Sequence, residues 1–168
     1  MIGIDTKIES LRARFASKLF TDVVGNSYES LGRAFITKRK VGSSLVDVPE
    51  LQISSTKKYL AVLPDRKIDG RSFFLVKTSI EPGDDLIAKV SIYFSVNLDT
   101  LYPSVTERAV EYLHRDVISI IRYTAFEFKH LETDLPAFEE FGQIKETDNM
   151  EPYYLCRFDT EIDYKINC

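Results

Sequence analysis

The sequence predicts an α+β fold: an antiparallel or mixed β-sheet with two amphipathic helices packed on one face. Two segments repeat apolar residues every three or four positions, as helices do. Several other segments alternate apolar and polar residues, as half-buried strands do. These strands occur in runs and do not alternate one by one with helices, which argues against a purely parallel sheet. The length of 168 residues predicts a single domain, residues 1–168.

The first helix is expected from Thr6 to about Phe20. Thr6 and Glu9 have the spacing of a capping box, in which each side chain satisfies a backbone N–H at the helix start. An apolar stripe follows, formed by Ile8, Leu11, Phe15 and Leu19. The stripe predicts a surface helix that packs on the core by one face, with binding of a partner protein as the alternative.

The next part of the chain has weaker patterns. Gly25–Ser27 and Val41–Ser44 are predicted to be turns. The strands expected here are Arg33–Lys40, Leu51–Ser54, Tyr59–Leu63 and Ser72–Ser79. Residues 64–71 are expected to close a hairpin between the last two. A flexible basic loop is expected around residues 38–50.

The clearest strand runs from Leu86 to Leu98. Its alternate positions form one apolar face: Ala88, Val90, Ile92, Phe94, Val96 and Leu98. The opposite face is polar, so only one face is expected to meet the core. A turn-forming segment, residues 81–85, precedes this strand and predicts an antiparallel hairpin with Ser72–Ser79.

The second helix is expected from Ser104 to about Tyr123. Ser104 and Glu107 again have the spacing of a capping box. The apolar stripe of this helix comprises Val110, Leu113, Val117, Ile120 and Ile121, and it should pack on the long strand. Residues 124–149 are acidic and rich in Phe, and are predicted to be irregular apart from a short strand at Ala125–Leu131. A final alternating strand is expected at Tyr153–Tyr164.

The net charge of −4 conceals an asymmetry between the two halves of the chain. Residues 1–80 carry a net charge of +6, and residues 81–168 carry −10. Either the halves interleave and the charges only solvate the surface, or basic and acidic surfaces lie on different sides. In the second case copies of the chain could associate head to tail.

No catalytic, metal-binding or cofactor-binding motif is evident, so we expect no enzyme activity and no cofactor. The glycines do not form a phosphate-binding loop. Cys156 and Cys168 lack metal-site spacing, and Cys156 is expected to be a small buried hydrophobe. His114 is the best acid–base candidate by residue type, but a histidine on a solvated helix face is the favoured interpretation. No apolar run has the roughly 18 residues of a membrane-spanning helix, and the N-terminus lacks a secretory signal pattern, so an intracellular protein is expected.

Basic residues could converge as a phosphate-contacting patch: Lys38, Arg39, Lys40, Lys57, Lys58, Arg66, Lys67 and Arg71. The isoelectric point of about 5.3 argues against a dedicated DNA-binding domain. The same cations could instead contact an acidic neighbouring subunit. The candidate acidic surface spans residues 127–148 and includes Glu127, Glu132, Glu139 and Glu140.

The order of elements resembles the tail-terminator and head–tail connector (neck) proteins of tailed bacteriophages. An amphipathic helix at Thr6–Phe20, a hairpin-rich sheet with Leu86–Leu98, a helix at Ser104–Tyr123 and a Tyr-rich strand at Tyr153–Tyr164 carry the resemblance. The ring proteins beneath the portal of crAss-like phages are a more specific possibility. The resemblance implies a structural protein of the virion, a closed homo-oligomeric ring joining the portal to tail proteins around the DNA channel. Residues 38–63 have no counterpart in it.

Two hypotheses of other classes remain. One is a cytosolic ligand-binding or enzymatic domain whose site is assembled from distant residues. The other is a small regulatory domain that binds one partner.

Overall fold

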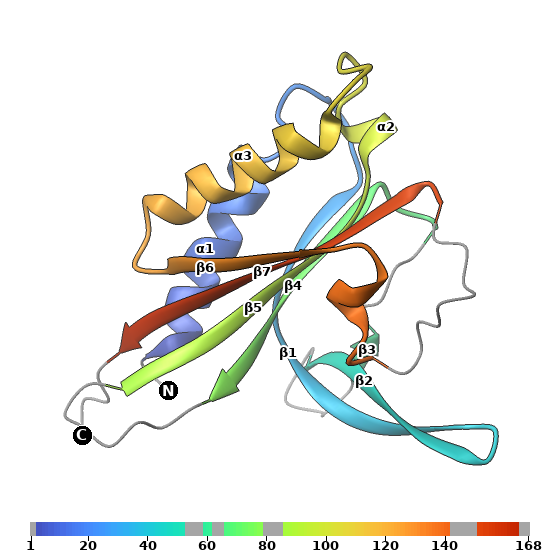
Figure 1. Ribbon diagram of the computed structural model, residues 1–168, viewed down its shortest axis with the longest axis vertical. Helices are drawn as coiled ribbons and strands as arrows, with labels where there is room; N and C mark the ends of the chain where they lie inside the picture. Colours follow the sequence, from blue (N-terminus) through green and yellow to red (C-terminus); the bar gives the residue numbers. More distant parts are fainter. Residues whose placement is uncertain (1–2, 53–58, 62–65, 79–85, 142–150, 165–168) are drawn as a thin grey trace.

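The computed structural model describes residues 3–52, 59–61, 66–78, 86–141 and 151–164. A seven-stranded sheet carries two main helices on one face (Figure 1). The elements in chain order are α1 (Ile4–Lys18), β1 (Tyr28–Val41), β2 (Ser44–Gln52), β3 (Tyr59–Ala61), β4 (Gly70–Thr78), β5 (Leu86–Asn97), α2 (Leu98–Leu101), α3 (Ala109–Arg122), β6 (Glu127–Thr133), the 3-10 helix η1 (Leu135–Phe138) and β7 (Tyr153–Tyr164). The predicted α+β class is confirmed.

The strand order in the sheet is β3-β2-β1-β4-β5-β7-β6. β1 and β4 run parallel, and the other neighbours run antiparallel, so the sheet is mixed. The predicted hairpin of β4 and β5 is confirmed. The predicted hairpin of Tyr59–Leu63 with Ser72–Ser79 is wrong, because β3 pairs with β2 while β4 lies between β1 and β5.

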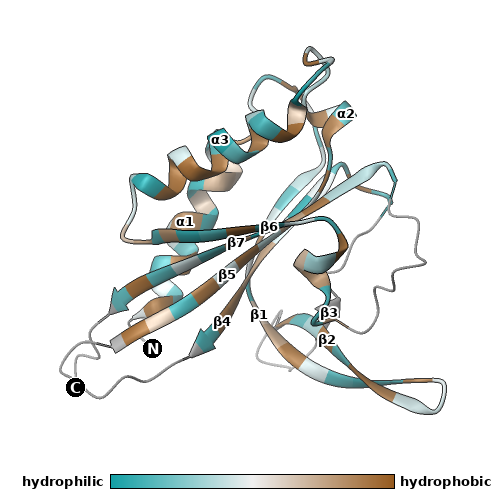
Figure 2. Cartoon of the chain, in the orientation of Figure 1, coloured by the Kyte–Doolittle hydropathy of each residue, from teal (hydrophilic) through white to brown (hydrophobic). Residues whose placement is uncertain are grey.

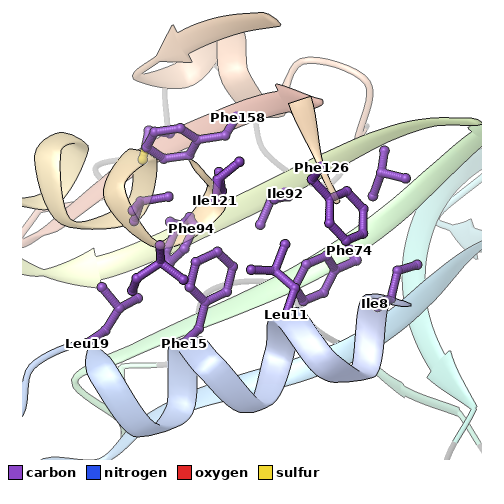
Figure 3. Close-up of a cluster of buried hydrophobic side chains, with 14 of the residues drawn as sticks. Ile8, Leu11, Phe15, Leu19, Phe74, Ile92, Phe94, Ile121, Phe126 and Phe158 are labelled. Atoms are coloured by element: carbon purple, nitrogen blue, oxygen red, sulfur yellow. The ribbon is translucent and has the colours of Figure 1, made fainter. Parts of the chain in front are cut away.

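The main core lies between the two helices and the sheet. Three α1 side chains, Ile8, Leu11 and Phe15, and Leu19 directly after the helix point toward the apolar face of β4 and β5 (Figure 3). The α3 residues Leu113, Val117, Ile120 and Ile121 complete the same cluster. Phe15 packs on two aromatic rings of the sheet, with its centroid 6.0 Å from that of Phe74 and 5.5 Å from that of Phe94. Both predicted apolar stripes therefore form the core, except that Val110 is only partly buried and lies outside this cluster.

Both predicted capping boxes are wrong. α1 begins at Ile4, so Thr6 lies inside its first turn, and no side chain caps the N-terminus of that helix. α3 begins at Ala109, with Arg108 at the cap position in a left-handed conformation. Ser104 lies several residues before this helix starts. In both cases the spacing occurs without the extended backbone that a capping residue needs.

The opposite face of the sheet carries a second core, so the prediction that this face is polar is wrong. Tyr93 is fully buried there and its ring stacks on Phe73 with centroids 4.8 Å apart. The segment after β6 lays Phe138 and Phe141 on these two rings. Residues 135–141 thus cover part of the face of the sheet that the helices leave open.

Candidate assembly interface

A two-stranded arm leaves the sheet at one end. β1 pairs with β4 only as far as Ala34, whose register partner is Leu75. Beyond Ala34, β1 continues to Val41 and pairs with β2 alone among the strands described. We call Phe35–Glu50 the arm; it projects away from the helices and the rest of the sheet (Figure 1).

The arm occupies the place where a flexible basic loop was expected around residues 38–50, and that prediction is wrong. Regular antiparallel pairing extends from Ala34 and Leu51 out to Val41 and Ser44. Only Gly42 and Ser43 form the turn between the strands. Gly42 has a φ of +63°, which a glycine adopts at low cost in a two-residue hairpin turn.

Apolar side chains are exposed on both faces of the arm. Phe35 and Val41 lie on one face and are 39% and 53% exposed. Ile36 and Leu45 lie on the other face and are 45% and 68% exposed. Figure 2 shows hydrophobic positions, coloured brown, along the arm. A hairpin with apolar residues on both faces is a surface that another molecule could cover.

Ion pairs within the arm reduce its positive charge. Lys38 Nζ lies 2.8 Å from Asp47 Oδ1, and Arg39 pairs with the buried carboxylate of Glu50. Lys40 is exposed and has no ion pair with any residue that the structure describes. The sequence pattern predicted a basic surface from the three cations alone. The acidic partners Asp47 and Glu50 were not expected there, because the pairing of β1 with β2 was not predicted.

The other predicted basic residues lie far from the arm. Arg71, at the start of β4, pairs with Glu29 at 2.9 Å and is only 8% exposed. Nine residues of extended strand separate Glu29 from Lys38, a span of about 30 Å. Arg66 and Lys67 are exposed at the Arg71 end. Among the described residues, Lys38, Arg39 and Lys40 therefore do not join Arg66, Lys67 and Arg71 in a single basic patch. Lys57 and Lys58 lie outside the described residues.

The predicted acidic residues divide into two groups. Glu127 and Glu132 lie on β6, at the far edge of the sheet from the arm. Glu139 and Glu140 follow η1, and Glu139 is exposed. Glu140 accepts a hydrogen bond from the Tyr93 hydroxyl and lies 3.1 Å from Lys77 Nζ, so this carboxylate helps to fix the second core.

The sheet order separates the basic and acidic halves of the chain. The strands from residues 1–80, namely β3, β2, β1 and β4, are neighbours at one side of the sheet. The strands from residues 81–168, namely β5, β7 and β6, occupy the other side. The strands of the two halves of the chain therefore do not interleave in the sheet.

The arm base adjoins an open groove of about 540 Å³ between α1 and β1. Two ion pairs line it, Arg33 with Asp5 at 3.0 Å and Arg12 with Glu9 at 2.6 Å. The apolar part of the lining comes from Ile8, Leu31, Phe35 and Leu51. Because each charged side chain in the groove already has an opposite partner, the groove offers no unpaired charge to a ligand.

His114 does not lie on a solvated helix face as the sequence suggested. It is half-buried between α3 and β7, with Nε2 2.9 Å from the Tyr154 hydroxyl. This burial lowers the pKa of His114. Cys156 is fully buried, as predicted, and burial raises the pKa of its thiol well above the ordinary range.

Among the residues with described positions, no group of three or more His, Cys, Asp and Glu side chains could hold a metal ion. No helix in the described ranges is long and apolar enough to cross a membrane. Comparisons with protein-family models, with curated proteins and with solved structures found no match.

Proposed function

We propose that this protein is a structural subunit of a homo-oligomeric ring at the head–tail junction of a tailed bacteriophage virion. Such a ring joins the portal to neighbouring neck or tail proteins and leaves a central channel for DNA. The subunit acts through its interfaces, and the arm is the observation that carries the proposal.

Burial of the arm is the first argument for assembly. Its four exposed apolar side chains, Phe35, Ile36, Val41 and Leu45, point to both faces of a thin hairpin. A monomer leaves all four side chains partly exposed to water, whereas a neighbour on each side would cover them. Burial of apolar surface is favourable by about 25 cal/mol per Å².

Charge distribution is the second argument, because it favours a head-to-tail contact. The first-half strands and the second-half strands lie at different ends of the sheet, and their parts of the sequence carry net charges of +6 and −10. Complementary potentials favour contacts between unlike surfaces of two copies. A contact between unlike surfaces produces a ring if the rotation between copies closes, and a filament if it does not.

The position at the head–tail junction comes from the resemblance in element order to tail-terminator and connector proteins. An amphipathic helix, a hairpin-rich sheet, a second amphipathic helix and a closing Tyr-rich strand are all present in the fold. A gene next to portal or tail genes would support this position, and a gene in a metabolic operon would contradict it.

Light scattering over a concentration series, followed by negative-stain imaging of the large species, tests the proposed ring. We expect closed rings of one size. A monomer at every concentration, both alone and with the portal protein as a template, would contradict the proposal.

The groove between α1 and β1 favours a second candidate function, a ligand-binding domain. Its volume of about 540 Å³ is adequate for a small molecule. A thermal-shift screen against metabolites distinguishes this function. A compound that stabilises the wild type, but not a variant with Phe35→Asp in the groove wall, would support it over the ring.

A further inference from the structure

We infer that the arms of neighbouring copies pair edge to edge, with β1 of one copy against β2 of the next, so that the arms form one continuous sheet. This inference rests on the proposed function and identifies one surface through which the subunits of the ring would meet, in addition to the contact between the two oppositely charged halves. The partner at this surface is a second copy of the same chain.

Two unpaired strand edges make the arm available for this contact. On β1, residues Phe35–Val41 pair with β2 on one side, and no described strand lies on the other side. On β2, pairing with β3 begins at Glu50, and Val48 and Pro49 are buried, so among the described residues the open outer edge of β2 is Ser44–Asp47. Each edge presents a row of backbone N–H and C=O groups that another strand can satisfy.

The geometry of a ring brings these two edges together. Hairpins that run along the axis of a ring all project in the same direction, so β1 of one copy lies beside β2 of its neighbour. The two strands then run antiparallel, as they already do within each arm. When the last copy meets the first, the sheet closes and no open edge remains.

The charges of the side chains favour pairing of β1 with β2 of the neighbouring copy, and they disfavour pairing of two β1 strands. The outer part of β1 carries Lys38, Arg39 and Lys40, and β2 carries Asp47 and Glu50. Antiparallel pairing of two β1 edges would set these cations against one another, which destabilises a sheet. Pairing of β1 with β2 repeats between copies the Lys38–Asp47 pair that is present within each arm.

Pro49 limits how far this contact extends. Proline has no backbone N–H to donate, so the outer edge of β2 is interrupted near the base of the arm. The remaining contact involves the outer positions, where Lys38, Arg39, Lys40 and Val41 lie opposite Asp47, Val46, Leu45 and Ser44 within the arm. Val41 and Leu45, 53% and 68% exposed in a single copy, would each gain a neighbouring strand.

Disulfide cross-linking between two single-cysteine proteins tests the inference. Lys40 and Leu45 are exposed register partners within the arm, and Lys40 makes no ion pair with the described residues. One protein carries Lys40→Cys and the other Leu45→Cys, both with Cys168→Ser, while the buried Cys156 stays. Because each protein has a single arm cysteine, a disulfide between positions 40 and 45 forms only between copies. A mixture of Lys7→Cys with Leu45→Cys is the matched control, since Lys7 is exposed on α1.

We expect mild oxidation of the mixture to give a cross-linked dimer, with at least ten-fold less dimer from either protein alone or from the control mixture. Urea unfolding of each variant checks that the fold is unchanged. Rings without the disulfide between positions 40 and 45, or with links mainly between identical positions, would overturn the edge pairing and leave the proposed ring standing. Monomers without any link would overturn both.

Discussion

Lys38 on β1 and Asp47 on β2 face each other across the arm, with Nζ 2.8 Å from Oδ1. The pair lies in the outer half of the hairpin, and both side chains are at least 42% exposed. An exposed pair of this kind contributes only about 0.2–1 kcal/mol to folding. Its larger effect is on the contact between arms, where each lysine would lie between two aspartates.

Reversing this pair tests the role of its charge in assembly. Lys38→Glu places a carboxylate beside Asp47 within the arm and beside Asp47 of the neighbouring copy. We expect the dissociation constant for assembly to rise about five- to ten-fold, which corresponds to roughly 1–1.4 kcal/mol. The double variant Lys38→Glu/Asp47→Lys rebuilds the pair and should restore assembly, while Lys7→Glu should have no effect. Sedimentation velocity over a dilution series measures all three, and failure of the double variant to recover would rule out this pairing.

Removing the Phe138 ring tests the second core. The ring is fully buried against Phe73 and Tyr93. Phe138→Ala should lower the free energy of unfolding by about 3–5 kcal/mol, as is usual for a large buried side chain. The neighbouring exposed Glu139 gives a control, because Glu139→Ala should change stability by no more than about 0.5 kcal/mol. Urea unfolding measures both, and equal values for the two variants would mean that this segment does not pack on the sheet.

Two glycines should differ in their tolerance of a methyl group. A Cβ at Gly70 would lie 2.7 Å from Val96 Cγ1 and 3.2 Å from the Val96 backbone, so Gly70→Ala should destabilise the fold by about 1–3 kcal/mol. A Cβ at Gly32 would lie 2.6 Å from Glu9 Oε1, the mobile end of an exposed side chain. Gly32→Ala should therefore lower the melting temperature less than Gly70→Ala does, as measured by thermal unfolding. The reverse order would contradict the close approach of β4 to β5 at Gly70.

His114 should make the fold less stable in mild acid. Burial between α3 and β7 lowers the pKa of His114 below its ordinary value of about 6.5, although the charge of Glu111 acts in the opposite direction. Between the lowered and ordinary pKa values, the unfolded chain binds a proton that the folded chain does not, so stability falls as the pH decreases through this window.

The His114→Gln variant should show a weaker loss of stability between pH 7 and pH 5.5 than the wild type. Urea unfolding at both pH values measures this difference, and NMR titration gives the pKa of His114 directly. A His114 pKa above 6.5 would contradict the described packing.

The helices and the central strands could be predicted from the sequence because their signals are local. Phe15 and Leu113 belong to stripes whose spacing depends only on helix geometry. The long alternation of β5 and β7 likewise gave nearly correct bounds. The helix starts were wrong because the Thr6–Glu9 and Ser104–Glu107 spacings occur without the cap backbone.

The candidate interface could not be predicted in the same way, because it depends on pairing between distant residues. The parallel contact of β1 with β4 joins Tyr28 to Gly70, and no local pattern reports it. Without the β1–β2 register, Lys38 and Arg39 looked like free cations of a loop. Phe138 and Phe141 lie in an acidic segment without strand or helix periodicity. Only the folded sheet shows that their rings cover Tyr93.

Sedimentation velocity of the wild type and of the Val41→Asp/Leu45→Asp variant at equal concentrations most directly tests whether the arm drives assembly. Both positions are exposed in a single copy, so the variant should keep the wild-type free energy of unfolding. We predict that the wild type sediments as one large closed species and the variant as a monomer. Identical sedimentation of the two proteins would contradict assembly through the arm.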